Sequence, residues 1–306
     1  MSAEVAVVGS YNVGLTVQTP RLPVIGETIL GERFLEGPGG KGSNQAIAAA
    51  RLGGEVHFVA CIGPDRYGDD ALALWEREGI HAHVRRDTTH TGIGLIFLYP
   101  DGDNAIIVTP GANSLLSPED VDLKEEAIAS CQVLLLQLEI RVETAIHAAK
   151  LAKRHGLTVI LNPAPVQPLS PEAFQFVDVL TPNETEAHVL IGEAPDSKLP
   201  LEGVAKRLLS LGVQAVVLTE GQAGVLIATA EGVETVRSPR VKTVDATGAG
   251  DAFNGVLAVG LAEGKSLVEA ARRACYAGAY CATRMEVMPG LARRAQLSRF
   301  IQQHPL

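Results

Sequence analysis

An aspartate that follows three small residues is the first candidate for chemistry in this chain. Gly248, Ala249 and Gly250 precede Asp251, and an apolar stretch with helical spacing follows. Asp251 is therefore expected in the first turn of a helix, where backbone N–H groups lack partners inside the helix. Such N–H groups can hold a phosphoryl group during transfer, while a carboxylate beside them can take a proton from an attacking hydroxyl. In the alternative interpretation, the aspartate only complements the helix dipole.

A second glycine-rich segment, GPGGKGSNQAIAAARLGG, spans residues 37–54. It is not a P-loop, because that motif ends in Gly-Lys followed by Ser or Thr, whereas Gly42 follows Lys41 here. We interpret the segment as a glycine turn that leads into a helix and presents Lys41 and Asn44 beside free N–H groups. These groups suit sugar hydroxyls or a phosphate. The alternative is a tight turn with a solvated lysine.

The elements that must position these motifs alternate between short apolar strands and helices. Near-continuous Val, Ile and Leu runs are typical of strands that are buried on both faces of a mostly parallel sheet. Such runs occupy residues 5–9, 56–61, 133–138, 157–161, 177–181 and 215–219. Helical patterns occupy 43–52, 69–79 and 142–155. This alternation predicts an α/β fold with a doubly wound, mostly parallel central sheet and helices on both faces.

Two segments break the alternation. Residues 12–38 contain strand-like pieces without a helix, and residues 91–110 predict a hairpin that turns at Asp101–Gly102. The two segments could form a small β-sheet lid over a cleft, or they could be extra edge strands of the main sheet. We expect residues 1–306 to form a single domain with such a lid, because the sequence shows no linker, repeat or low-complexity tract.

The composition argues against several classes of function. The formal net charge of -9 and the pI near 5.4 disfavour a nucleic-acid partner, since nucleic-acid-binding surfaces are normally basic. No apolar run reaches the roughly 18 residues of a membrane span, and the N-terminus does not resemble a signal peptide. Cysteines are scattered at Cys61, Cys131, Cys275 and Cys281, so we expect reduced, buried thiols and a cytoplasmic protein.

The two glycine-rich motifs occur in order with six further short motifs. These are GSYN (9–12), TGIGLIF (91–97), GANS (111–114), QLE (137–139), NPAP (162–165) and TPNETEA (181–187). Together they resemble the ribokinase-like (PfkB) family of sugar kinases over almost the whole chain. The resemblance implies a ribokinase-like fold and an enzyme that uses ATP and Mg²⁺. Such an enzyme transfers the γ-phosphoryl group to a hydroxyl of a small sugar or polyol, and ribose, giving ribose 5-phosphate, is the default acceptor.

The resemblance also implies roles for individual residues. Asp251 is implied to be the catalytic base, and the anion hole is implied at Gly248, Ala249 and Gly250. The implied sugar ligands besides the base are Asn12, Gly40, Lys41, Asn44 and Glu139. The implied nucleotide-binding residues are Asn183, Thr219, Gly221, Gly224 and Gly250. Glu186 is implied to position Mg²⁺ through water, in agreement with the preference of Mg²⁺ for oxygen ligands and retained waters. A helix N-cap is the alternative role for TPNETEA.

The chain departs from the family pattern at two places. Gly14, in the sugar site, stands where the ribose-phosphorylating members have an aspartate that binds ribose hydroxyls. Loss of such a group changes substrate discrimination, so another pentose, a hexose or a polyol is an alternative acceptor. Potassium-activated members have an aspartate before the anion hole, which Asp245 and Thr247 match, and a late loop. In that loop Glu286 replaces a glycine and Gly290 a serine, so a monovalent cation at Asp245, Thr247 and Glu286 is left open.

Two other functions fit parts of the sequence. A nucleoside kinase would need an apolar or aromatic slot near the lid, which Tyr11 could supply, although GGKGSNQA favours a free sugar. A sugar-binding regulatory protein without catalysis would lack the base or the anion hole, and both are present in the sequence. By analogy with family lids that pair, we also expect a homodimer formed through the lid.

Overall fold

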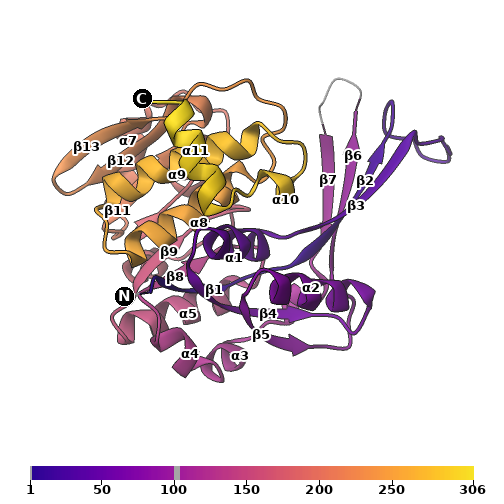
Figure 1. The fold of residues 1–306 in the computed structure, drawn as a ribbon, viewed down its shortest axis with the longest axis horizontal. Helices are drawn as coiled ribbons and strands as arrows, with labels where there is room; N and C mark the ends of the chain where they lie inside the picture. Colours follow the sequence, from indigo (N-terminus) through magenta and orange to yellow (C-terminus); the bar gives the residue numbers. More distant parts are fainter. Residues whose placement is uncertain (1, 100–103) are drawn as a thin grey trace.

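The computed structural model describes residues 2–99 and 104–306. A nine-stranded sheet forms the main body, and a four-stranded sheet stands off its right-hand side in Figure 1. In spatial order the large sheet contains β13 (Gly232–Arg237), β12 (Gly224–Thr229), β11 (Ala215–Thr219), β10 (Val179–Leu180), β9 (Thr158–Leu161), β8 (Val133–Leu136), β1 (Glu4–Val8), β4 (Glu55–Ile62) and β5 (His81–Arg86). All neighbours pair in parallel except β11 with β12 and β12 with β13. The predicted mostly parallel α/β sheet is confirmed.

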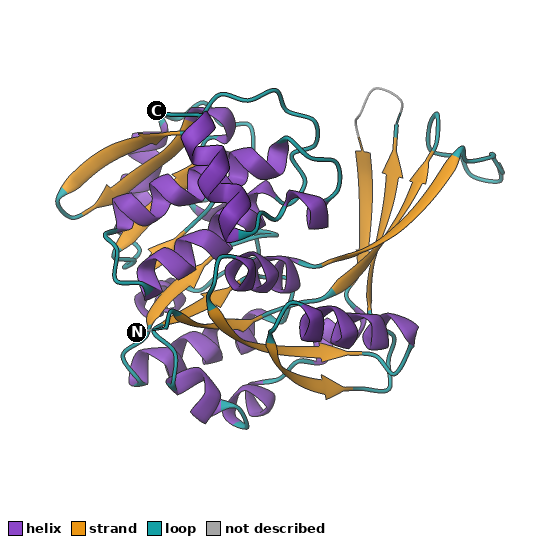
Figure 2. Ribbon diagram, viewed as in Figure 1, coloured by secondary structure: helices purple, strands orange, loops and turns teal. Residues whose placement is uncertain are grey.

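Helices cover both faces of this sheet (Figure 2), and each face has its own core. In β1, Val5 and Val7 belong to one core, whereas Ala6 and Val8 belong to the other. The first core is covered by α1 (Lys41–Arg51), α2 (Arg66–Arg77), α8 (Ala249–Ala262), α9 (Leu267–Ala282) and α11 (Arg294–Gln303). The second is covered by α3 (Pro118–Asp122), α4 (Glu125–Ala129), α5 (Val142–Arg154), α6 (Glu184–Leu190) and α7 (Leu201–Leu209). Because both faces are buried, the strands appear in the sequence as unbroken apolar runs.

The small sheet forms from the two segments that were predicted to make a lid. Its order is β3 (Arg33–Gly39), β2 (Asn12–Gln18), β6 (Gly92–Leu98) and β7 (Asn104–Thr109). β2 pairs antiparallel with β3 and parallel with β6, and β6 and β7 form the expected antiparallel pair. The predicted turn at Asp101–Gly102 lies outside the described residues. Since these strands form a sheet of their own, the alternative of extra edge strands on the main sheet is wrong.

The strand order of the large sheet reverses at β1. The chain passes from β1 to β4 on one side, and the later strands β8 and β9 lie on the other. In doubly wound sheets, ligands bind beyond the carboxyl ends of the strands at such a reversal. Residues 9–12 follow β1, residues 137–139 follow β8 and Asn162 follows β9, so three of the sequence motifs meet at this edge.

Three findings concern membrane-spanning helices, the cysteines and metal-binding clusters. No helix among the described residues combines the length and the apolar character that crossing a bilayer demands. The cysteines at positions 61, 131, 275 and 281 are buried and free, as predicted. Within residues 2–99 and 104–306 no group of three or more His, Cys, Asp or Glu side chains could hold a metal ion.

Candidate active site

Asp251 lies in the first turn of α8, on the side that faces α1. Gly248, the N-cap residue, has a left-handed backbone with φ 81°, which L side chains rarely adopt. Asp251 is 7% exposed, and its carboxylate accepts hydrogen bonds from Asn44 Nδ2 at 2.9 Å and Gln45 Nε2 at 3.0 Å. The two helices can pack this closely because Gly255 has no Cβ, which would otherwise lie only 2.6 Å from the Gln45 carbonyl oxygen. The predicted base and a predicted sugar ligand are thus direct neighbours.

Backbone N–H groups without acceptors surround the start of α8. Among the described residues, the N–H groups of Gly248, Gly250 and Asp251 have no hydrogen-bond partner. Ala249 differs from the prediction, because its N–H donates to the Ala246 carbonyl oxygen at 3.1 Å. That bond closes the tight turn made by the left-handed Gly248. The N–H groups open to a phosphoryl group are therefore those of the two glycines and of the aspartate itself.

Glu139, which follows β8, joins three segments of the chain. Its Oε2 accepts hydrogen bonds from Ser10 Oγ at 2.6 Å, Asn12 Nδ2 at 3.2 Å and the Lys41 N–H at 2.9 Å. Gly40, the N-cap residue of α1, has φ 84°, and a Cβ there would lie 2.6 Å from the backbone nitrogen of Asn12. Only glycine fits this position. The structure thus brings together the sugar ligands predicted after β1, before α1 and after β8, and it adds Ser10, which the sequence did not indicate.

Asn113, from the motif GANS, fixes the side chain of Asn12. Asn113 Nδ2 donates to Asn12 Oδ1 at 2.9 Å, and Asn113 Oδ1 accepts from the Tyr11 N–H at 3.0 Å. The amide nitrogen of Asn12 is thereby turned toward Glu139. The Tyr11 ring lies in the core, edge-on to Trp75 with ring centroids 5.4 Å apart. Tyr11 therefore does not line the slot that a nucleoside kinase would need.

Gly14 lies two residues beyond Asn12 on β2 and so belongs to the same face of the small sheet. The strand register aligns it with Gly37 on β3 and Gly94 on β6. None of the three glycines has a left-handed φ, and a Cβ on Gly14 would meet its nearest neighbour at 3.5 Å, an ordinary contact. The fold therefore does not require glycine at position 14. The sheet face beside Asn12 carries no side chain at these aligned positions of the three strands.

Lys41 places a positive charge among three carboxylates. Burial alone would lower the pKa of Lys41, yet this pKa is raised, because Asp251, Glu139 and Glu186 outweigh burial. Burial raises the pKa of Glu186, and the negative charge of Asp251 adds to the effect. The ammonium group therefore stays charged at neutral pH and can neutralise an anion held near α1 and α8.

Asn183 and Glu186 form a capping box at the start of α6. Asn183 Oδ1 accepts from the Glu186 N–H at 2.8 Å, and Glu186 Oε2 accepts from the Asn183 N–H at 2.9 Å. The N-cap alternative is therefore correct as far as local structure goes. The capping box engages only Oε2 of the Glu186 carboxylate, since within the described part of the chain Oε1 has no donor. A single β-bridge also places Asn183 beside Thr219.

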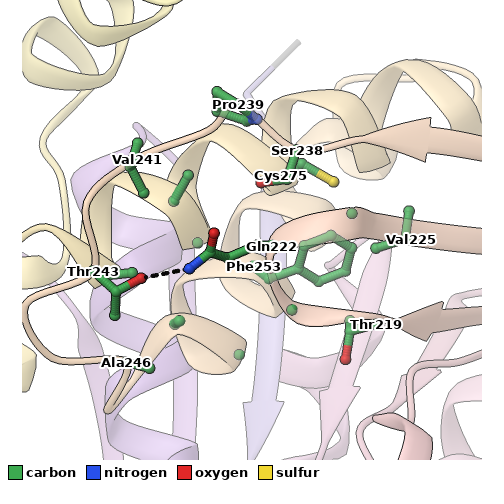
Figure 3. Close-up of a pocket in the computed structure, with 17 residues that line it drawn as sticks. Thr219, Gln222, Val225, Ser238, Pro239, Val241, Thr243, Ala246, Phe253 and Cys275 are labelled. Atoms are coloured by element: carbon green, nitrogen blue, oxygen red, sulfur yellow. Dashed lines mark hydrogen bonds between the residues drawn. The ribbon is translucent and has the colours of Figure 1, made fainter.

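A pocket beside the start of α8 contains most of the predicted nucleotide residues (Figure 3). These are Thr219, Gly221, Gly224 and Gly250. The pocket is otherwise largely apolar, with Val225, Val241, Phe253, Cys275 and Ala279 in its wall. Gln222 Nε2 donates to Thr243 Oγ1 at 3.0 Å at one side. An apolar slot that ends at free N–H groups suits the base and the phosphates of a nucleotide. Asn183 is not part of the wall.

Asp245 joins the loop before α8 to the loop before the short helix α10 (Val287–Gly290). Its Oδ1 accepts from the Thr247 N–H at 2.9 Å and its Oδ2 from the Glu286 N–H at 3.0 Å. Glu286 has φ 66° and so adopts the glycine-like conformation expected of the residue it replaces. Such a conformation costs a non-glycine residue about 1–3 kcal/mol. The three residues considered for a monovalent cation are thus neighbours, and both Asp245 oxygens already bind backbone N–H groups.

Behind Asp251 lies a layer of buried polar side chains that the sequence did not single out. They are Gln45, Gln137, Asn162, Thr181 and Asn254. Each falls inside one of the sequence motifs, but amides and hydroxyls do not titrate, so their residue types gave no chemical signal. The signal that could have found them is a polar residue at a position that the helix or strand pattern assigns to the core.

Comparison with known proteins identifies the family. A family model described as pfkB family carbohydrate kinase matches residues 2–292. The ribokinase of Haemophilus influenzae is 36% identical over 311 residues, which covers 99% of each chain. The deoxyribokinase of Salmonella typhi is 38% identical over 258 residues, or 83% of this chain and 84% of that protein.

Solved structures give the same answer for the fold. The crystal structure of ribokinase from Thermotoga maritima superimposes with a TM-score of 0.91 and 37% identity, over 98% of this chain and 99% of that one. Arabidopsis thaliana ribokinase complexed with ribose and ATP superimposes with a TM-score of 0.89 and 31% identity, over 99% of both chains. With the family model spanning nearly all of the sequence, the chain belongs to the pfkB family of carbohydrate kinases.

Proposed function

We propose that this protein is an ATP-dependent sugar kinase that phosphorylates ribose to ribose 5-phosphate. The main support is the arrangement at the start of α8. There the buried side chain of Asp251 meets the proposed sugar ligand Asn44, and Gly250, whose N–H has no acceptor among the described residues, lines the apolar pocket. The similar Arabidopsis protein has ribose and ATP in its solved structure. The assignment rests on this site as well as on the shared fold.

In this proposal the sugar lies between α1, Glu139 and the small sheet. Asn44 Oδ1 is buried and has no donor among the described residues. A buried acceptor without a donor costs about 1–3 kcal/mol, so a sugar hydroxyl that donates to it would be bound favourably. Asn12, Gly40, Lys41 and Glu139 supply the remaining polar contacts.

Asp251 acts as the general base. It takes the proton of the sugar's primary hydroxyl while that oxygen attacks the γ-phosphorus, and the bond to the bridging oxygen breaks to release ADP. The N–H groups of Gly248 and Gly250 receive the charge of the transferred group. Lys41, whose pKa is raised, adds a nearby positive charge.

The nucleotide base lies in the apolar pocket, with Thr219, Gly221 and Gly224 around it and Asn183 near the phosphates. Glu186 fits a role in holding Mg²⁺ through water, because its Oε1 is a hard oxygen without a donor in the described structure. Bound Mg²⁺ would neutralise phosphate charge. We propose that the hydrogen bonds of Asp245 to Thr247 and Glu286 fix the start of α8. Initial rates in sodium, potassium and a bulky organic cation test whether these three residues also bind a monovalent cation.

A coupled ADP-release screen over pentoses, hexoses, polyols and nucleosides tests the proposed function. We expect the highest kcat/KM with ribose and almost no activity in Asp251→Asn. Absence of sugar-dependent ADP release from the folded wild-type protein would overturn the assignment as a kinase. A preference for a nucleoside, or for a hexose or polyol, would instead overturn ribose as the acceptor.

Deoxyribose is a second candidate acceptor, which Gly14 favours. Without a carboxylate at this position, one hydrogen-bonding partner of the sugar hydroxyls is missing. Its absence weakens the binding of a sugar with one hydroxyl fewer less than it weakens the binding of ribose. The Salmonella typhi relative is named a deoxyribokinase. Equal or higher kcat/KM for 2-deoxyribose than for ribose would decide in favour of this acceptor.

We further propose that the protein forms a homodimer through the small sheet, in the cytoplasm. The sheet face opposite Asn12 exposes three large apolar side chains, Phe34, Leu95 and Ile107, which are 60%, 38% and 58% exposed. An apolar group of this kind is typical of a surface that another protein covers. Light scattering on the purified protein tests the proposal, and a monomer at micromolar concentration contradicts it.

A further inference from the structure

The carboxylate of Asp251 lies at one end of a chain of buried amides. Its Oδ1 accepts from Gln45 Nε2 at 3.0 Å, and Gln45 Oε1 in turn accepts from Gln137 Nε2 at 2.6 Å. Both glutamine side chains are fully buried. They come from α1 and from the segment after β8, so the base is held by groups outside its own helix.

The orientation of these amides follows from chemistry. An ionised carboxylate only accepts hydrogen bonds, so the amide nitrogen of Gln45 must face Asp251. The amide oxygen of Gln45 must then face the nitrogen of Gln137. A flipped Gln45 would place its oxygen against a carboxylate oxygen, which is repulsive. The chain therefore has one arrangement as long as Asp251 is charged.

A second branch leads from Gln45 back to α8. Gln45 Nε2 also donates to Asn162 Oδ1 at 3.1 Å, and Asn162 Nδ2 donates to the Thr181 carbonyl oxygen at 3.0 Å. Thr181 Oγ1 donates to Asn254 Oδ1 at 2.6 Å. Asn254 Nδ2 donates to the Gly250 carbonyl oxygen at 2.9 Å. The hydrogen bonds thus form a circuit that starts at the base and returns to the residue directly before it.

We propose that Gln45 is a positioning residue for the phosphoryl transfer. It locks the carboxylate of Asp251 in the orientation that meets the sugar hydroxyl, and the circuit ties this orientation to the peptide at Gly250 that contacts the transferred group. The inference rests on the proposed kinase function. A carboxylate held by Asn44 alone could rotate about its side-chain bonds, whereas donors to both oxygens leave one orientation. Misplacement of a reacting group by about 1 Å can cost about 100-fold in rate.

A positioning role has a signature in the kinetics. A carboxylate that has lost one of its two donors still lies beside the sugar, so KM for the sugar changes little while the rate of phosphoryl transfer falls. A purely structural loss lowers Tm and does not separate kcat from KM in this way.

The test compares steady-state kinetics of Gln45→Leu, Gln45→Glu and Gln137→Met with wild type. For Gln45→Leu we expect kcat to fall about 10- to 100-fold while KM for the sugar changes less than about threefold. Gln45→Glu keeps the size of the side chain but cannot donate when ionised, so its loss of kcat should be at least as large. Gln137→Met leaves the bond to Asp251 and should lose less than either.

Gln214→Leu is the matched control. Gln214 Nε2 donates to Asp178 Oδ1 at 2.7 Å, which is also an amide–carboxylate bond but lies just before β10 and β11, at the amino ends of these strands and so away from the proposed site. This variant should lower Tm and leave kcat and KM as in wild type. If Gln45→Leu does not fold, the other two variants decide.

Two outcomes separate this inference from the proposed function. Wild-type kcat in the folded Gln45 variants overturns the inference and leaves the kinase assignment intact. A wild-type protein without sugar-dependent ADP release overturns the kinase assignment and the inference with it.

Discussion

Replacing Gly14 with aspartate tests whether the missing carboxylate limits ribose phosphorylation. The alternation of β2 places residue 14 on the same face as Asn12, so the new carboxylate would lie beside the proposed sugar site. A Cβ at this position would lie 3.5 Å from the Gly37 carbonyl oxygen and 3.6 Å from Ile96 Cδ1. Both are ordinary contacts, and the backbone is not left-handed. Gly14→Asp should therefore fold without strain.

The gain can be estimated from the hydrogen bond that the new carboxylate would make. A hydrogen bond to a charged group contributes about 1.5–3 kcal/mol, which corresponds to about 10- to 150-fold in kcat/KM. The carboxylate must lose water when the sugar binds, and it is repelled by Glu139, which Asn12 joins to this face. We therefore expect the lower end, about a 10-fold higher kcat/KM for ribose.

The assay is initial-rate ADP release with ribose and with 2-deoxyribose, on wild type, Gly14→Asp, Gly14→Asn and Gly14→Ala. Asparagine has the shape of aspartate without the charge, and alanine reports the effect of losing glycine alone. The aspartate variant should exceed both controls with ribose and gain less with 2-deoxyribose. A folded Gly14→Asp protein whose kcat/KM for ribose equals that of Gly14→Ala refutes the reasoning.

Three further predictions concern the base, the strained loop and the thiols. Asp251→Asn should lower kcat about 10²- to 10⁴-fold because the general base is lost, and a loss below 10-fold in the same ADP assay would contradict that role. Glu286→Gly should raise the free energy of unfolding by about 1 kcal/mol, since glycine adopts a positive φ without strain. Urea unfolding measures this free energy. A Glu286→Gly protein that is less stable than wild type would contradict strain at this residue. Burial raises the pKa of Cys61 to about 11 and the pKa values of Cys131, Cys275 and Cys281 to about 12. Because the thiolate is the reactive form, iodoacetamide at pH 8 should leave the folded protein unlabelled and should label all four cysteines after unfolding. Mass spectrometry measures the labelling. Rapid labelling of the folded protein would contradict the burial of the cysteines.

The central strands could be predicted because burial on both faces leaves a direct trace in the sequence. VAVV in β1 and VLLL in β8 have no polar interruption. The edge strands could not be predicted in this way. HAHVRR in β5 and GVETVR in β13 each have only one strand neighbour, and their polar side chains tolerate the exposure. β12 was also missed, although its sequence GVLIAT is apolar.

For the three helices whose ranges were predicted, the boundaries agree to within a few residues, and the errors have local causes. α1 begins at Lys41 instead of Ser43, because Gly40 with its positive φ turns the chain directly into the helix. α2 begins at Arg66 instead of near Asp69, because Asp65 caps it by accepting a hydrogen bond from the Gly68 N–H. Both signals were present in the sequence but are weaker than the apolar periodicity that fixed the helices themselves.

The candidate site could be predicted where a residue type has chemistry of its own, as with the carboxylate of Asp251. The partners that hold it could not, because a glutamine has no chemical signal until the fold shows what it binds. Asn44 illustrates the difference. Its position in a motif marked it as a ligand, but only the structure places its Nδ2 on Asp251 while its Oδ1 stays without a donor in the described structure. A sugar hydroxyl that donates to that oxygen would bind the same amide that orients the base. Substrate binding and base orientation would then be coupled through one side chain, and Gln45, on the other carboxylate oxygen, keeps the base in place before the sugar arrives.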